Sequence, residues 1–85
     1  MIRSDGGRSG MLYDVITFLY ESGYEFEVRF VPKEAVNVKG PRGKHLEISI
    51  KNERIVIFNF NDAVEKEFEY LSQAERYIDY ALRSK

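Results

Sequence analysis

The chain has 85 residues, the size of a single domain that buries a small core and gains stability from association. Its 13 Lys and Arg against 14 Asp and Glu leave a net charge of −1, which argues against the basic excess typical of a nucleic-acid-binding domain. The chain has no cysteine, which excludes disulfides and thiolate metal sites.

Residues 1–10 contain three glycines and two serines and show no regular period. We interpret them as a flexible N-terminal segment, with Met11 as a candidate native start, and expect residues 11–85 to form one domain. The charges near the N-terminus are not followed by the apolar run of a signal peptide, and the helix expected after them is too short to span a bilayer. We therefore expect a cytoplasmic protein that does not enter a membrane.

Residues 11–21 predict a helix with more apolar surface than one small core can cover. At 100° per residue, Asp14, Thr17 and Glu21 fall on one polar strip about 60° wide. The apolar positions and two tyrosines span about 220°, whereas packing on one core needs a stripe of about 100°. The centre of this arc should pack on the sheet, and it consists of Leu12, Val15, Ile16 and Leu19. The excess predicts a second burial surface, provided either by wrapping structure of the same chain or by another chain, at the two margins of the helix.

Four later segments predict strands. Residues 24–30 alternate between apolar and charged side chains, as a half-buried strand does, and Pro32 ends the alternation. Residues 32–45 hold two glycines and two prolines and predict a loop. Residues 46–51 and 55–60 flank a polar turn and should form a hairpin. Residues 64–70 predict a fourth strand, with Lys66 pointing inward as a charge that protects a sheet edge.

The order helix, four strands, helix predicts an α+β fold (αββββα). We expect a four-stranded antiparallel meander with both helices on one face, in two layers. The last helix should begin at a capping box formed by Ser72 and Glu75. Strand 55–60 is apolar on both faces, so it should lie in the middle of the sheet with both sides covered. Only one side is covered by the helices, and a partner is expected on the other.

Five apolar residues are therefore candidates for a protein interface. Met11 and Phe18 lie at one margin of the first helix, and Tyr13 and Tyr20 lie at the other. Phe58 lies on the uncovered face of strand 55–60. Aromatic side chains are favoured in protein interfaces. The tyrosines also fit the edge of a core with their hydroxyls in water, or stacking on nucleic-acid bases.

The loop 39–45 is a second candidate site, because it holds four potentially cationic groups within seven residues: Lys39, Arg42, Lys44 and His45. Such a loop predicts a local contact with an anion or a nucleic acid. The alternative is a solvated surface loop without a ligand.

At Gly40-Pro41, His45 and the strand that follows, the chain resembles the double-stranded-RNA-binding domain. That family has a helix, three antiparallel strands and a second helix, with a similar loop between its first two strands. Its strongest phosphate-binding signal is a lysine cluster that opens the last helix. This chain has Ser-Gln-Ala-Glu-Arg there, at residues 72–76, so the family's activity is not carried over.

No combination of residues predicts catalysis. His45 is the only histidine, and the glutamates at 65, 67 and 69 share one face of a strand, as solvated side chains do. We expect a non-enzymatic protein-interaction module that acts as a homo-oligomer or as a subunit of a complex. Nucleic-acid binding through the loop 39–45 is the alternative. No cofactor, metal ion or small-molecule substrate is expected.

Overall fold

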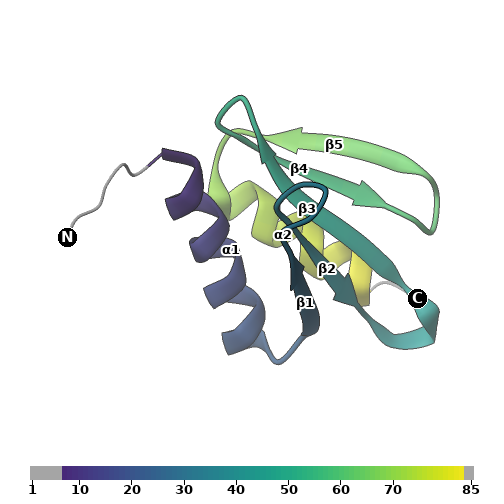
Figure 1. Ribbon diagram of the computed structural model, residues 1–85. Helices are drawn as coiled ribbons and strands as arrows, with labels where there is room; N and C mark the ends of the chain where they lie inside the picture. The colour runs from purple at the N-terminus through teal and green to yellow at the C-terminus, as the bar shows by residue number, and fades with distance from the viewer. Residues whose placement is uncertain (1–6, 84–85) are drawn as a thin grey trace.

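The computed structural model, which describes residues 7–83, shows a helix, a five-stranded antiparallel sheet and a second helix (Figure 1). The sheet is a meander in which each strand pairs with the next along the chain. Its elements are α1 (Gly7–Ser22), β1 (Glu25–Arg29), β2 (Ala35–Lys39), a short 3-10 turn at Pro41–Gly43, β3 (His45–Lys51), β4 (Arg54–Asn59), β5 (Val64–Phe68) and α2 (Leu71–Arg83).

The expectation of four strands was wrong, because the segment 32–45 contains β2. The two prolines of that segment flank β2 and lie outside its hydrogen-bonded part. Between them, Val36 and Val38 alternate with more polar residues and are fully buried, so the strand pattern is present but short. β2 pairs Val36 with Val28 of β1 and with Ile48 of β3, and thereby joins the first strand to the rest of the sheet.

α1 begins at Gly7, four residues before the expected start at Met11. The expected boundary between a flexible segment and the domain therefore falls inside α1, and the rest of that segment, residues 1–6, lies outside the described residues. The helix ends at Ser22, one residue after the expected span 11–21. Gly23 has φ +82°, and the N–H groups of Gly23 and Tyr24 donate to the carbonyls of Tyr20 and Leu19, the hydrogen-bond pattern of a Schellman cap.

The core lies between the two helices and one face of the sheet (Figure 1). Leu12, Val15 and Leu19 are buried there, and Ile16 is half-buried against them, as the centre of the apolar arc predicts. The sheet contributes the buried side chains Val36, Val38, Leu46, Ile48, Ile55 and Ile57, and α2 contributes Ala74, Ile78, Ala81 and Leu82. α2 contacts β4 and β5, whereas α1 reaches across to β1, so the two helices lie side by side above the sheet.

α2 begins earlier than its expected capping box. The N–H groups of Gln73 and Ala74 donate to the carbonyl of Tyr70, and the side-chain Oε1 of Gln73 accepts the N–H of Tyr70. The reciprocal bond of a capping box is therefore made by Gln73 instead of Glu75, because Leu71 joins the helix and moves its start two residues upstream. Neither helix within residues 7–83 is long and apolar enough to cross a membrane.

Gly40 allows the end of β2 to approach α2. A Cβ atom at this position would lie 2.7 Å from Cδ2 of Leu82, which is itself fully buried. The glycine in this basic loop therefore has a packing function that is independent of any phosphate contact.

We expect Gly40→Ala to lower the free energy of unfolding by about 1–3 kcal/mol, the usual cost of overpacking a core. Urea or thermal unfolding measures this loss. If the Leu82 methyl group is the cause, the substitution costs less in a Leu82→Val background, because valine lacks that atom. An equal cost in both backgrounds would show that another contact is responsible.

Candidate protein interface

The two margins of α1 have different environments. Met11 and Phe18 are half-buried and pack against the core. Tyr13 and Tyr20, on the opposite margin, are 70% and 77% exposed. Of the four helix residues predicted at an interface, only the two tyrosines thus present most of their surface to solvent.

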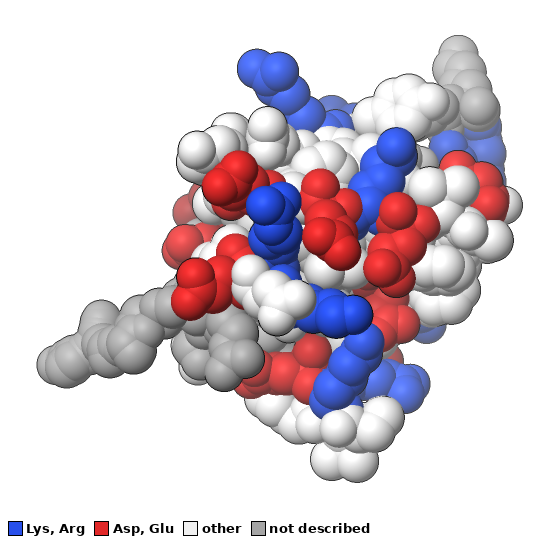
Figure 2. Space-filling view, turned by 90° about the horizontal axis from the view of Figure 1, so that it is seen from above, with Lys and Arg blue, Asp and Glu red and all other residues white. Residues whose placement is uncertain are grey.

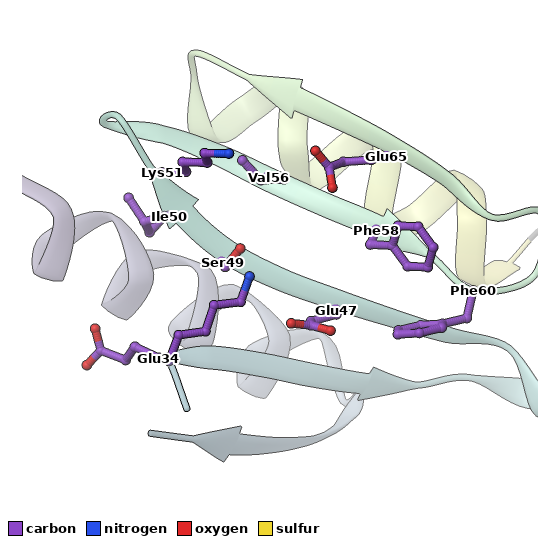
Figure 3. Close-up of a pocket in the computed structure, with 10 residues that line it drawn as sticks. Glu34, Glu47, Ser49, Ile50, Lys51, Val56, Phe58, Phe60 and Glu65 are labelled. Atoms are coloured by element: carbon purple, nitrogen blue, oxygen red, sulfur yellow. The ribbon is translucent and has the colours of Figure 1, made fainter. Parts of the chain in front are cut away.

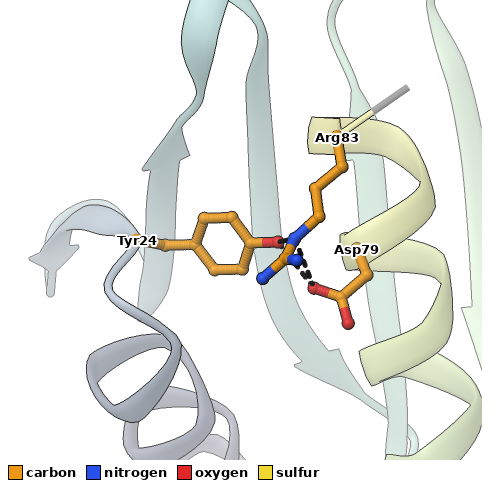
Figure 4. Close-up of polar contacts among 3 residues, drawn as sticks. All are labelled: Tyr24, Asp79 and Arg83. Atoms are coloured by element: carbon orange, nitrogen blue, oxygen red, sulfur yellow. Dashed lines mark hydrogen bonds and ion pairs between the residues drawn. The ribbon is translucent and has the colours of Figure 1, made fainter. Parts of the chain in front are cut away.

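The margin with Phe18 faces α2. The Phe18 ring lies 6.4 Å from the ring of Tyr24, which follows the cap of α1. The Tyr24 hydroxyl donates to Oδ1 of Asp79 at 2.5 Å and accepts from Nε of Arg83 at 2.8 Å (Figure 4). Asp79 and Arg83 are one turn apart on α2 and form an ion pair at 3.6 Å. We call these three residues the Tyr24 clamp, because they fix the C-terminal end of α1 to α2.

Burial raises the pKa of the Tyr24 hydroxyl above its ordinary value of 10.0, and the hydrogen bond to the Asp79 carboxylate raises it further. Arg83 acts in the opposite direction, since its positive charge stabilises a phenolate. The net direction is upward, so the folded state favours the protonated hydroxyl.

Met11 and Phe18 pack against the core at one margin of α1, Tyr13 and Tyr20 are exposed at the other margin, and the helix itself contacts β1. The chain leaves β1 through Phe30 and Val31, which are 68% and 81% exposed. We call the surface formed by Tyr13, Tyr20, the outer edge of β1, Phe30 and Val31 the β1 side. It combines large exposed apolar side chains with an edge strand.

The two edge strands of the sheet differ in chemistry. β5 carries Lys66 on the helix-facing side, where its Nζ lies 6.0 Å from the centre of the Tyr77 ring. Lys66 therefore lies on the helix-facing side as the sequence predicts, and a charge in that position disfavours pairing with another strand. β1 has only Phe26 and Val28 on its helix-facing side, both half-buried, and its charged residues point to the other face. β1 therefore lacks the inward charge that protects β5.

The face of the sheet opposite the helices contains a groove of about 770 Å³ (Figure 3). Val56 is buried at its floor, Phe58 is half-buried, and Phe60 is 47% exposed at its rim. Charged residues of neighbouring strands also line it, among them Lys51 and Glu65. Much of the second apolar surface of β4 is therefore covered by side chains of the sheet itself, and Phe58 presents less surface than its sequence position indicates.

The four residues of the basic loop 39–45 differ in their exposure and contacts. Lys39 and Arg42 are exposed, and Lys44 is half-buried. The His45 ring stacks on Phe60 with 4.5 Å between centroids, and its Nε2 lies 2.9 Å from Oδ1 of Asn37. His45 therefore belongs to the sheet surface. On the face shown in Figure 2, cationic and acidic side chains are interspersed, and neither sign forms a continuous patch.

Among residues 7–83, no group of three or more His, Asp or Glu is arranged to hold a metal ion. No protein-family model matches the chain, and no curated protein and no solved structure matches it significantly.

We expect the Tyr24 clamp to make the free energy of unfolding depend on pH in the alkaline range. A raised pKa in the folded state contributes stability that is present below the unfolded pKa and is lost as the pH rises through the folded pKa. Between about pH 9 and about pH 11, we expect wild-type protein to lose more stability than Tyr24→Phe, which has no hydroxyl to titrate. Urea midpoints of both proteins across this range measure the difference. Parallel losses would show that Tyr24 does not report on folding.

Proposed function

We propose that the protein is a non-enzymatic interaction module that works as a homo-oligomer, with the β1 side as its interface. The observation that carries this proposal is the coincidence of four exposed large side chains with an unprotected strand edge. Tyr13, Tyr20, Phe30 and Val31 are each at least 68% exposed. Phe30 and Val31 directly follow β1, the edge strand without a charge on its helix-facing side, and the helix that carries the two tyrosines contacts β1.

Burial of apolar side chains would provide the driving force for association at this surface. Fully burying a large apolar side chain contributes about 1.5–3 kcal/mol. A two-fold axis repeats each contact, so every side chain that the interface covers contributes twice. The cost of immobilising these residues is small for tyrosine and phenylalanine, which have only two side-chain torsions each.

The electrostatics favour a second copy of the chain over a nucleic acid. The chain is close to neutral, with a net charge of −1, and its cations are interspersed with carboxylates on the face seen in Figure 2. Phosphate binding needs a concentration of positive charge. In the alternative function, Lys39 and Arg42 remain the exposed cations that would bind nucleic acid.

Light scattering across a range of protein concentrations tests the proposal. We expect wild-type protein to have the mass of a dimer or a larger assembly, largely independent of salt. Tyr20→Asp and Phe30→Asp should give folded monomers, because each places a charge in the apolar interface. Leu19→Asp should unfold the chain instead, since Leu19 is fully buried in the core.

Tyr80→Asp is the matched control. Tyr80 is 69% exposed, like the interface tyrosines, but it lies on α2, away from the β1 side. We expect this variant to keep the wild-type mass. A wild-type protein that is monomeric at all concentrations would contradict self-association. A monomer that also shifts nucleic acid at low salt, with loss on neutralising Lys39 and Arg42, would support the alternative function.

A further inference from the structure

We infer that the β1 side pairs with the β1 side of a second copy, strand to strand, about a two-fold axis that passes through Val28. This inference rests on the proposed self-association and specifies how the copies meet. The two five-stranded sheets would join into one continuous antiparallel sheet, with the α1 helices of both copies flanking the axis.

β1 can pair with a second copy because its outer edge has unpaired backbone N–H and C=O groups and its side chains are compatible with pairing. An edge strand presents N–H and C=O groups that its own sheet does not satisfy. Pro32 cannot donate a hydrogen bond, but it lies beyond the segment 25–31 that would pair. At the opposite edge, an axis through Lys66 would place the two Lys66 side chains opposite each other and Glu65 opposite Glu67, which are like-charge pairs.

The positions of the helices restrict the register. An axis perpendicular to the sheet keeps both helix layers on one side, so residues that lie opposite each other must point to the same face. Glu27 points to the open face and Val28 to the helix-facing side, as their pairing with Asn37 and Val36 shows. The axis must therefore pass through a residue and cannot pass between two residues.

The remaining registers differ in which charged side chains of the two copies lie opposite each other. An axis at Glu27 places two Glu27 side chains opposite each other, and an axis at Arg29 does the same with arginine. An axis at Val28 places Glu27 of one copy opposite Arg29 of the other, twice, with no pair of like charges. Opposite charges on facing strands stabilise pairing, and like charges destabilise it.

The Val28 axis also uses the exposed apolar residues. It places Phe30 opposite Phe26 of the second copy on the helix-facing side, and it extends the pairing to Val31. α1, which carries the exposed Tyr13 and Tyr20, contacts β1 on that same side of the sheet. Backbone hydrogen bonds, ion pairs and apolar contacts thus agree on one arrangement.

Single cysteines test the register, because the chain has none of its own. Glu27 and Arg29 are exposed, so Glu27→Cys and Arg29→Cys should leave the fold intact. Residues directly opposite on antiparallel strands have Cα atoms about 4.5–5.5 Å apart, within disulfide range, whereas diagonal neighbours lie about 7–8 Å apart. Each variant is oxidised alone, and an equimolar mixture of the two is oxidised in parallel, in a glutathione redox buffer.

We expect the mixture to form a disulfide between position 27 of one chain and position 29 of the other, several-fold in excess of either homodimer. Mass spectrometry of the cross-linked peptides identifies the linkage. The mixture of Glu65→Cys and Glu67→Cys is the matched control, since both residues are exposed, have the same spacing and lie on the other edge strand. It should form no preferred link.

The outcomes separate the register from the proposed function. A link at 27–27 or at 29–29 would overturn the Val28 axis while leaving strand pairing and self-association in place. An oligomer with no link at either position would overturn strand pairing and direct attention to the groove around Phe58. A wild-type monomer in light scattering would remove both the inference and the proposed function.

Discussion

The packing of Leu12, Val15 and Leu19 into the core fixes the rotation of α1 about its own axis, and this rotation decides which side chains of the helix are left for a partner. With these residues facing the sheet, one margin of the helix packs against the core and the other is left exposed. The Tyr24 clamp joins the C-terminal end of α1 to α2 through two hydrogen bonds, whose partners Asp79 and Arg83 are themselves ion-paired within α2. Tyr13 and Tyr20 consequently lie on the exposed margin.

The meander topology determines the rest of the proposed interface. Because each strand pairs with its neighbour in the chain, the first and last strands become the two edges. The last strand is protected by Lys66, whose ammonium group lies over the Tyr77 ring. The first strand has no such charge and is followed by two exposed apolar residues. This asymmetry is the basis of the proposed interface, because a two-fold assembly would use one such side per copy and then close.

Much of the fold could be predicted from periodicity. The alternation of residues 24–30, 46–51 and 55–60 identified three strands, and the apolar arc of α1 identified the residues that reach the core. β2 was missed because prolines and glycines on either side outweighed a five-residue alternation. The start of α2 was misplaced because a glutamine side chain provides the cap that a Ser and Glu pair was expected to form. Turn residues and capping residues can each favour more than one local structure, and tertiary packing determines which of these structures forms.

The candidate site was predictable only in part. The excess apolar surface of α1 was visible in the sequence, and it correctly singled out Tyr13 and Tyr20 as exposed aromatic residues. The position of α2 beside α1 could not be predicted, because the Tyr24 clamp joins residues 55 and 59 apart in the sequence. The expected four-stranded meander already had strand 24–30 at an edge, but Phe30 and Val31 were missed as exposed residues, although two apolar residues directly before a proline offered a signal.

Hydrogen exchange of the β1 amides tests the central claim most directly, because the outward-facing N–H groups of an edge strand exchange quickly until another strand binds them. The account predicts that amides of residues 25–31 that face away from β2 become protected as the protein concentration rises, while outward amides of β5 keep exchanging quickly. Outward β1 amides that exchange quickly at every concentration, in a protein that nevertheless associates, would contradict the claim that β1 is the interface.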